Sequence, residues 1–195
     1  MRTFALLLLA LAACSGDSSS TQPPAAPVST PLGPVTFRFQ NQGTANVYVD
    51  LTFGAALAVH SDAHPEPYAL KTNCTFACPD ACTSCVQCGA PQPRVKVITP
   101  GSYFDTTWNG TWYTFQSCTG SFCQCYDAHV VSPGTFHVSL AGALGVTGGT
   151  PDPQDATILQ NAELDTGSGT CTAQQSFDLT TAAATVDIVF TCAAP

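Results

Sequence analysis

Apolar and polar residues alternate along several short stretches, and this period of two constrains the fold more than any other feature of the chain. Residues 35–40 read Val-Thr-Phe-Arg-Phe-Gln, and residues 47–53 read Val-Tyr-Val-Asp-Leu-Thr-Phe. Successive side chains of a β-strand point to opposite faces, so each stretch predicts a strand with one buried face. Because an Asn/Gly-containing segment, residues 41–44, separates them, we expect these two strands to form a hairpin.

The same reasoning extends β-structure to the end of the chain. Pro100-Gly101 and Pro133-Gly134 mark turns, and Asn109-Gly110 predicts a hairpin between the strands on either side of it. Helical periodicity is nearly absent. We therefore expect an all-β fold, an immunoglobulin-like β-sandwich with a cysteine-rich, disulfide-stapled loop region. The further strands are expected at residues 94–97, 102–108, 112–115, 135–140, 176–179 and 185–190.

The last two expected strands flank residues 180–184, and their register predicts one disulfide. Opposed residues of an antiparallel hairpin have a constant sum of residue numbers. A turn centred between Thr181 and Ala182 therefore places Cys171 opposite Cys192, at the far end of the hairpin. We expect these two cysteines to be joined; the alternative is a β-bulge that shifts the register, so that each bridges elsewhere.

The N-terminus carries an export signal. Arg2 gives a positive start, residues 4–10 form an apolar run, and small residues lead to Cys14. The run is much shorter than the roughly 20 residues that a transmembrane helix needs. The sequence Leu11-Ala12-Ala13-Cys14 resembles the lipobox of bacterial lipoproteins at every position. A plain secretory signal with an accidental cysteine is the alternative.

The lipobox resemblance implies cleavage before Cys14, a thioether-linked diacylglycerol on the Cys14 sulfur and an acylated amine. The lipid bilayer is then a partner, because two or three acyl chains anchor a protein firmly. Ser15 stands where lipoprotein sorting would read an aspartate as retention in the inner membrane, so the resemblance favours the outer membrane, on its periplasmic or its surface face. Residues 1–13 are the expected signal peptide, residues 14–34 a lipidated cysteine with a flexible Ser/Thr/Pro tether, and residues 35–195 a single domain.

The chain has 11 cysteines. If Cys14 carries lipid, an even number remains, as expected for a disulfide framework in an exported protein. Most of them fall in two insertions, near residues 72–92 and 118–126. The disulfide candidates are Cys74, Cys78, Cys82, Cys85, Cys88, Cys118, Cys123, Cys125, Cys171 and Cys192.

Charge excludes one class of partner. Removal of residues 1–13 leaves four of the five cations and all 13 acids, so the formal net charge of the mature chain is −9. A nucleic-acid-binding protein needs a basic stripe that neutralises phosphates, and four scattered cations cannot form one. Nucleic acid is therefore not an expected partner.

Two segments resemble bacterial immunoglobulin-like and fibronectin-type-III-like modules. Trp108-Asn109-Gly110 and, downstream, residues 132–138 (Ser-Pro-Gly-Thr-Phe-His-Val) are similar to a Trp-Asp-Gly hairpin followed by a Pro-x-Gly-Thr-Tyr strand. Flagellar hook-cap modules and a family of bacterial proteinase inhibitors carry that pattern. The resemblance implies a tryptophan packed across a sandwich and glycines in turns with positive φ. Phe136 replaces the usual tyrosine, and a cysteine-bearing insertion separates the two halves.

The cysteines of residues 74–88 allow two interpretations. Cys82-Thr83-Ser84-Cys85 and Cys85-Val86-Gln87-Cys88 are both C-x-x-C, a spacing with which two thiolates hold one zinc ion. Outside the cytoplasm, however, thiols tend to oxidise, so we favour a disulfide loop and predict no metal ligand. Pro79 suggests one short helix inside this loop, over residues 79–86.

Histidines offer a second metal pattern. Residues 60–64 place two histidines four apart with acids beside them, which on a helix would suit zinc. Two prolines in residues 65–67 argue against a helix, so we interpret these side chains as exposed loop histidines. His129 and His137 are isolated in the sequence.

No pattern assigns a catalytic residue. Residues 167–169, Gly-Ser-Gly, lack the spacing of a nucleophile elbow, and we expect them in a Gly/Thr-rich loop. Asp152 and Asp155 lie in a Pro/Gly-containing loop, where we expect them to be solvated. A glycine-rich phosphate-binding turn is also absent from the sequence. We therefore predict no enzymatic activity and no cofactor.

The sequence as a whole predicts a membrane-anchored, exported lipoprotein with a non-catalytic binding or structural module at the cell envelope. Its partner, a protein or a glycan, is not identified by any motif. The two cysteine-rich insertions are expected to form a rigid lobe at one end of the sandwich. Binding surfaces usually lie on loops held by a scaffold, so this lobe is the expected binding region. A periplasmic metal-binding protein that uses the cysteines of residues 74–88, and a proteinase-inhibitor-like module, are the alternatives. Five aromatic residues near the lobe could add a contact surface: Trp108, Trp112, Tyr113, Phe122 and Tyr126. For the two tryptophans, core packing is favoured.

Overall fold

The alternating stretch at residues 35–40 is strand β1 (Val35–Gln40), in which Val35, Phe37 and Phe39 are buried. The computed structural model describes residues 32–52, 57–71, 76–78, 89–118 and 124–193. These residues form ten strands joined by turns and loops, and none of them is helical. The prediction of an all-β chain is therefore confirmed.

The expected strands are present, and the last ones are longer than their patterns indicate. Strands β8 and β9 extend well beyond the alternating residues, since they pair with each other along most of their length. The other strands are β2 (Val47–Asp50), β3 (Leu57–Ser61), β4 (Arg94–Ile98), β5 (Tyr103–Trp108), β6 (Thr111–Ser117), β7 (Gln124–Val130), β8 (Gly134–Pro151), β9 (Ile158–Leu179) and β10 (Ala184–Ala193).

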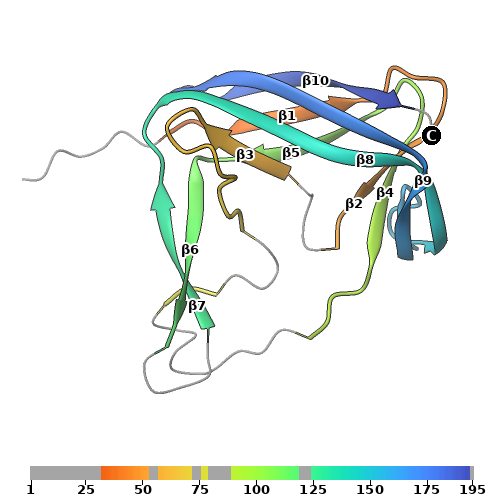
Figure 1. Cartoon of the computed structure of the whole chain (residues 1–195), viewed down its shortest axis with the longest axis horizontal. Coiled ribbons are helices and arrows are strands. Elements are labelled where there is room, and N and C mark those ends of the chain that lie inside the picture. Colours follow the sequence, from red (N-terminus) through yellow and green to blue (C-terminus); the bar gives the residue numbers. More distant parts are fainter. Residues whose placement is uncertain (1–31, 53–56, 72–75, 79–88, 119–123, 194–195) are drawn as a thin grey trace, which may run out of the picture. The chain divides into compact units, whose positions relative to one another are not determined.

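The long hairpin β8–β9 organises the main sheet (Figure 1). The strand order is β3-β8-β2-β4-β9-β10-β1-β5, with β8 and β9 also bonded directly to each other. Residues 134–143 of β8 pair with residues 170–179 of β9, and β3 and β10 flank this half of the hairpin. β2 and β4 adjoin the hairpin farther along, and β1 runs parallel to β10.

The hairpin changes register between Ala143 and Gly145. A Cβ atom on Gly145 would lie 2.6 Å from the Ser168 side chain, so only glycine fits where the two strands approach each other. The expectation that residues 167–169 form a loop is wrong, because they belong to β9. A glycine-rich segment can continue a strand through such an irregularity, since glycine tolerates the bent backbone.

One hydrophobic core receives side chains from most strands of the main sheet. Phe37 of β1 and Phe177 of β9 meet edge to face, with ring centroids 4.9 Å apart. Trp108, at the end of β5, is only 5% exposed and packs edge to face on Phe136 at 5.5 Å. The core position favoured for Trp108 is therefore confirmed, and its indole N–H donates to the carbonyl oxygen of Thr111 at 2.8 Å.

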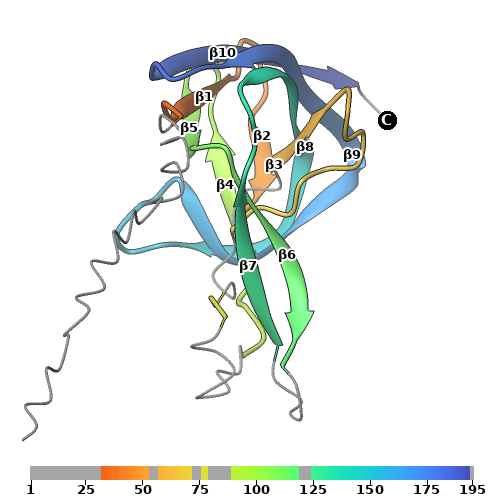
Figure 2. The same cartoon turned by 90° about the vertical axis from the view of Figure 1, so that its left-hand side faces the viewer.

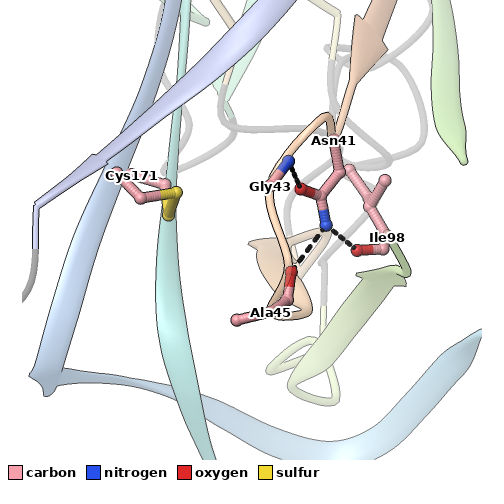
Figure 3. The surroundings of a disulfide bond; sticks show 6 residues. Asn41, Gly43, Ala45, Ile98 and Cys171 are labelled. Carbon is pink, nitrogen blue, oxygen red and sulfur yellow. Dashed lines mark hydrogen bonds between the residues drawn. A yellow bond between two sulfur atoms is a disulfide. The ribbon is translucent and has the colours of Figure 1, made fainter. Parts of the chain in front are cut away.

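The first predicted hairpin is wrong in its pairing. β1 pairs with β5 and β10, whereas β2 pairs with β4 and β8. The Asn41 side chain explains the difference: it is 2% exposed and donates to the carbonyl oxygens of Ala45 and Ile98, while its own carbonyl accepts from the N–H of Gly43 (Figure 3). These bonds hold the connecting loop against the end of β4, so the chain passes from β1 to a different part of the sheet.

The second predicted hairpin is also wrong, although its turn forms. Gly110 has φ of 78°, and Asn109 Oδ1 accepts a hydrogen bond from the N–H of Thr111. β5 nevertheless pairs with β1, while β6 pairs with β7 in a separate two-stranded sheet. The turn thus connects two sheets instead of two paired strands. The resemblance also implied a positive φ for Gly134. Gly134 is instead the first residue of β8, and its φ is not positive.

The final hairpin agrees with the prediction. Cys192 of β10 lies opposite Cys171 of β9 in the antiparallel ladder. The two cysteines form a disulfide, and Figure 3 shows Cys171 beside the loop that Asn41 holds. The pairing keeps the sum of residue numbers predicted from the turn, although next to the turn residues 184–189 of β10 pair with β1 and residues 174–179 of β9 pair with β8.

Candidate functional site

β6 and β7 pair antiparallel beside the main sheet's strands (Figure 2), and Cys125 of β7 belongs to the second disulfide. Residues 76–78 run beside β7: Tyr126 donates its N–H to the carbonyl oxygen of Phe76, and Cys78 is bonded to Cys125. We call residues 76–78, 111–118 and 124–130 the stapled lobe. An isolated hairpin is marginally stable in water, so the extra segment and the disulfide are what hold this one in shape.

All described cysteines are in disulfides. Cys78 and Cys125 are joined to each other, as are Cys171 and Cys192, and Cys118 is disulfide-bonded as well. Within these ranges no group of three or more His, Cys, Asp or Glu side chains could hold a metal ion. The other cysteine candidates lie outside the described residues: Cys74, Cys82, Cys85, Cys88 and Cys123. The expected helix at residues 79–86 also lies outside them.

The hairpin β6–β7 has two faces of different chemistry, because side chains alternate along each strand. One face, the Trp112 face, carries Trp112 opposite His129 and Thr114 opposite Asp127. Cross-strand hydrogen bonds join Thr114 Oγ1 to His129 Nε2 at 2.7 Å and Gln116 to Asp127. His129 is thus not isolated in the folded protein: its ring also lies 4.8 Å from the Trp112 ring.

Trp112 connects the lobe to the main sheet. Its ring lies 5.4 Å from Tyr68 and 5.9 Å from His64, and Tyr68 stacks on His64 at 4.7 Å. Tyr68 continues into the core, since it also stacks on Trp108 at 6.4 Å. Unlike Trp108, Trp112 is not part of the described core cluster, so the preference for core packing is correct for only one of the two tryptophans.

A cavity of about 510 Å³ opens at this junction, and we call it the Trp112 cavity. Aromatic rings form part of its wall, and Ser61 and Asp62 add polar groups from the end of β3. Its size falls in the range of small-molecule sites, which combine apolar walls with a few polar groups. The complete lining is Ser61, Asp62, Ala63, His64, Tyr68, Trp112, Val131, Ser132, Pro133, Gly134, Thr135 and Phe136.

A tight turn fixes His64 in this wall. Ser61 and His64 exchange backbone hydrogen bonds of 3.1 Å, and His64 Nδ1 lies 2.8 Å from the carbonyl oxygen of Glu66. A carbonyl oxygen only accepts, so Nδ1 must carry the proton and donate it. The Nε2 atom of neutral His64 is then a hydrogen-bond acceptor. The interpretation of His60 and His64 as exposed loop histidines is wrong, because His60 lies in β3 and both rings are stacked.

His60 and His137 meet on the outer face of the main sheet. Their rings stack at 5.0 Å, since His60 of β3 and His137 of β8 are direct partners in the ladder. His137 Nε2 lies 2.9 Å from Asp62 Oδ1, and its Nδ1 lies 2.9 Å from Ser176 Oγ. The expectation that His137 is isolated is therefore wrong. Sequence reasoning missed this cluster because its members come from three strands and a turn.

The Ser176–His137–Asp62 series has the order of groups found in serine hydrolases. A carboxylate only accepts, so His137 Nε2 donates to Asp62, and Nδ1 of the neutral ring accepts from the Ser176 hydroxyl. Catalysis would also need oxyanion donors in a site that excludes water. Asp62 is 86% exposed, and Ser176 lies on an open strand face. A pocket of about 440 Å³ lies against His60, His137 and Ser176, and Asp62, which orients the His137 ring, does not line it.

A second cavity, of about 490 Å³, lies on the other side of the junction. Lys71, Thr106 and Tyr113 contribute to its wall, and we call it the Lys71 cavity. Lys71 is exposed and, in the part of the chain that the structure describes, has no carboxylate within 4.0 Å. The other three described cations are paired: Arg38 with Asp105, Arg94 with Asp152, and Lys96 with Asp155.

The expectation of solvated carboxylates is correct for Asp155, whose side chain is 43% exposed, and wrong for Asp152, whose side chain is 12% exposed. Hydrogen bonds from Thr157 and Lys96 lower the pKa of Asp155 to about 2. The amide of Gln160 and the backbone N–H of Gln154 lower the pKa of Asp152 in the same direction. These carboxylates pin the β8–β9 turn to β4, so their role is structural. Neither Asp152 nor Asp155 lines the Trp112 cavity or the Lys71 cavity.

The described ranges include no helix that is long and apolar enough to cross a membrane. No protein-family model, no curated protein and no solved structure matches this chain.

Proposed function

We propose that this chain is an exported lipoprotein, anchored through acylated Cys14, whose domain is a non-catalytic binding module at the cell envelope. The complete lipobox-like sequence, residues 11–14, supports the anchor, and Ser15 favours the outer membrane. The described cysteines are all disulfide-bonded, which agrees with folding in an oxidising compartment.

The finer fold that we propose is an immunoglobulin-like β-sandwich. Two observations support it. β1 pairs parallel with β10 and antiparallel with β5, and side chains from most strands of the main sheet share one hydrophobic core. In a β-sandwich the inner faces of two layers share one core, and the proposal assigns the shared core of this domain to such an arrangement.

The Trp112 cavity is the observation that carries the binding proposal. It combines ring surfaces with hydrogen-bonding groups in fixed orientations, and it lies where a disulfide-stabilised lobe meets a rigid sheet. Ligand sites often lie at such junctions. Both elements are already ordered, so binding costs little conformational entropy. A protein segment or a glycan fits this chemistry, since both offer apolar surface together with hydrogen-bonding groups.

The metal-binding alternative is less well supported. Cys78 is bonded to Cys125 and so cannot serve as a thiolate ligand within residues 74–88. The proteinase-inhibitor alternative rests on the resemblance of Trp108-Asn109-Gly110 and residues 132–138 to modules of several functions, and a fold alone does not assign an activity. Binding at the Trp112 cavity remains the proposal with structural support.

Site-specific photo-crosslinking tests it. Ser132 is exposed and lines the Trp112 cavity, whereas Thr172 is exposed on β9 outside the cavity. A photoreactive residue at Ser132 should give a specific adduct in intact cells, and the same residue at Thr172 should not. Trp112→Ala in the Ser132 background should abolish the adduct. Equal labelling from both positions, or none from Ser132, would contradict binding at this cavity.

A further inference from the structure

We propose that the second face of the β6–β7 hairpin rests on the surface of the bilayer that holds Cys14. We call it the Phe115 face; it consists of Thr111, Tyr113, Phe115, Ser117, Tyr126, Ala128 and Val130. This inference rests on the proposed lipid anchor, because the anchor is what would bring this face to a bilayer.

The Phe115 face exposes apolar side chains. Phe115 is 51% exposed and Val130 is 67% exposed. Phe115 packs edge to face on Tyr126 at 5.6 Å, which holds both rings at the surface of the hairpin. Aromatic rings with a polar end, together with aliphatic side chains, are typical of the membrane–water interface.

Charge distinguishes this face from the rest of an acidic chain. Of the described residues on the Phe115 face, none is charged, although the chain has 13 acids and only five cations. A cation adjoins this face: Lys71, the described cation without a carboxylate partner, shares a cavity with Thr111 and Tyr113, whereas Asp127 belongs to the Trp112 face. A lysine beside an apolar face can extend its ammonium group toward lipid phosphates. Anionic lipids repel the negatively charged surfaces elsewhere on the domain.

The chain reaches the domain close to this hairpin. A Cβ atom on Gly110, the residue before β6, would lie 2.7 Å from Leu32 Cδ1, so Leu32 packs at the foot of the hairpin. Cys14 precedes Leu32 by 18 positions. Eighteen residues reach at most roughly 60 Å even when fully extended. An acylated Cys14 would therefore keep the root of the hairpin within that distance of the bilayer.

Area argues against a second copy of the chain as the occupant. Each strand of the hairpin has seven residues. At about 3.3 Å per residue and a strand spacing of about 4.8 Å, the face covers only roughly 220 Å². A stable protein interface needs about 800 Å² on each partner. A bilayer requires no such area, because the anchor already supplies a high local concentration of lipid, and weak insertion is then sufficient.

Quenching by brominated lipid tests the contact. The mature acylated protein is reconstituted into phosphatidylcholine vesicles with or without bromine on the acyl chains. Phe115→Trp should gain an emission that is shifted to the blue and is quenched severalfold more strongly by brominated lipid than the emission of Val189→Trp. Val189 is the matched control, since it is also exposed but lies on β10. The parent protein gives the contribution of Trp108 and Trp112.

Three outcomes would overturn the inference. Equal bromine quenching at the two positions would remove the preference for this face. A blue shift at Phe115→Trp without bromine quenching would assign the face to a protein contact. Absence of both effects would leave it in water. An intact mass of the same sample reports acylation of Cys14, so failure of the anchor is distinguished from failure of the membrane-facing surface.

Discussion

Cys78 and Cys125 are joined across 47 residues of sequence, and their bond ties the segment at residues 76–78 to strand β7. Tyr126, the next residue of β7, exchanges backbone hydrogen bonds with the same segment. The same hairpin carries Trp112, whose ring lies 5.4 Å from the ring of Tyr68 in the wall of the Trp112 cavity. The disulfide thus stabilises the hairpin that contributes Trp112 to the proposed binding cavity.

The disulfide between Cys171 and Cys192 should contribute measurably to global stability. It closes a loop of 21 residues within the main sheet. The chain-entropy model assigns about 3 kcal/mol to a loop of this length. For a domain of this size, Cys171→Ala/Cys192→Ala should lower Tm by roughly 6–12 °C, measured by calorimetry. Thr172→Ala/Thr191→Ala, which alters the adjacent opposed pair, is the control and should have a much smaller effect. An equal decrease in both variants would show that strand propensity, not the cross-link, is responsible.

The two tryptophans should respond differently to truncation. Trp108 is buried among Phe136 and Phe177, so Trp108→Ala should destabilise the domain by about 3–5 kcal/mol. Trp112 lies in the cavity wall, so Trp112→Ala should cost much less in denaturant unfolding and should leave the disulfides intact. A greater loss of stability for Trp112→Ala than for Trp108→Ala would mean that the junction, not the sheet, contains the main core.

Acid should disrupt the β8–β9 turn at an unusually low pH. The folded-state pKa of Asp155 is about 2, below its ordinary value of 3.8, because Thr157 and Lys96 bond the carboxylate. A depressed pKa contributes stability that is present above the unfolded value and is lost as pH falls through the folded value. This contribution should therefore persist down to about pH 4 and disappear between pH 4 and 2. Carboxyl NMR titration measures the pKa, and Thr157→Val should raise it. A titration near 4 in the parent protein would contradict the hydrogen bonds.

Ser176 should not behave as an enzymatic nucleophile, although His137 and Asp62 are bonded in series with it. A fluorophosphonate probe should leave Ser176 unmodified, and hydrolysis of a chromogenic ester should be the same for the parent and for Ser176→Ala. The reason is that Asp62, the carboxylate that orients His137, is largely solvated. Labelling of Ser176 that is lost in His137→Ala would overturn the assignment of a non-catalytic module.

The strands were predictable because their signal is local. Each alternating stretch, such as residues 35–40, contains within itself the pattern that buries one face. Pairing is not local, and the expected partner of β1 was wrong because a buried side-chain amide, that of Asn41, controls where the chain goes next. Asn109-Gly110 likewise marks a real turn, but burial of Trp108 keeps β5 in the main sheet while β6 begins another.

The candidate site was only partly predictable for the same reason. Cys171 and Cys192 could be matched because their pairing keeps the sum of residue numbers that a turn at residues 180–184 predicts. His137 and Ser176 are also cross-strand partners, and the Pro151–Pro153 turn is the signal that would have paired them. The register shift between Ala143 and Gly145 intervenes, however, so counting from that turn gives the wrong partner. Tyr68 lies in a loop without a periodic pattern, so its contact with Trp112 could not be anticipated.

The most direct test of an anchored, disulfide-stabilised module is the intact mass of the mature protein, purified from the membranes of a bacterium that processes lipoproteins. Thiol alkylation is carried out with and without prior reduction. The predicted result is a chain without residues 1–13, with two or three acyl chains on Cys14, and with no alkylation until the other ten of the 11 cysteines are reduced. A Cys14 thiol that alkylates freely would contradict the anchor. Four or more alkylatable cysteines with a zinc- or copper-sized native adduct would contradict the disulfide framework and assign the function to residues 74–88.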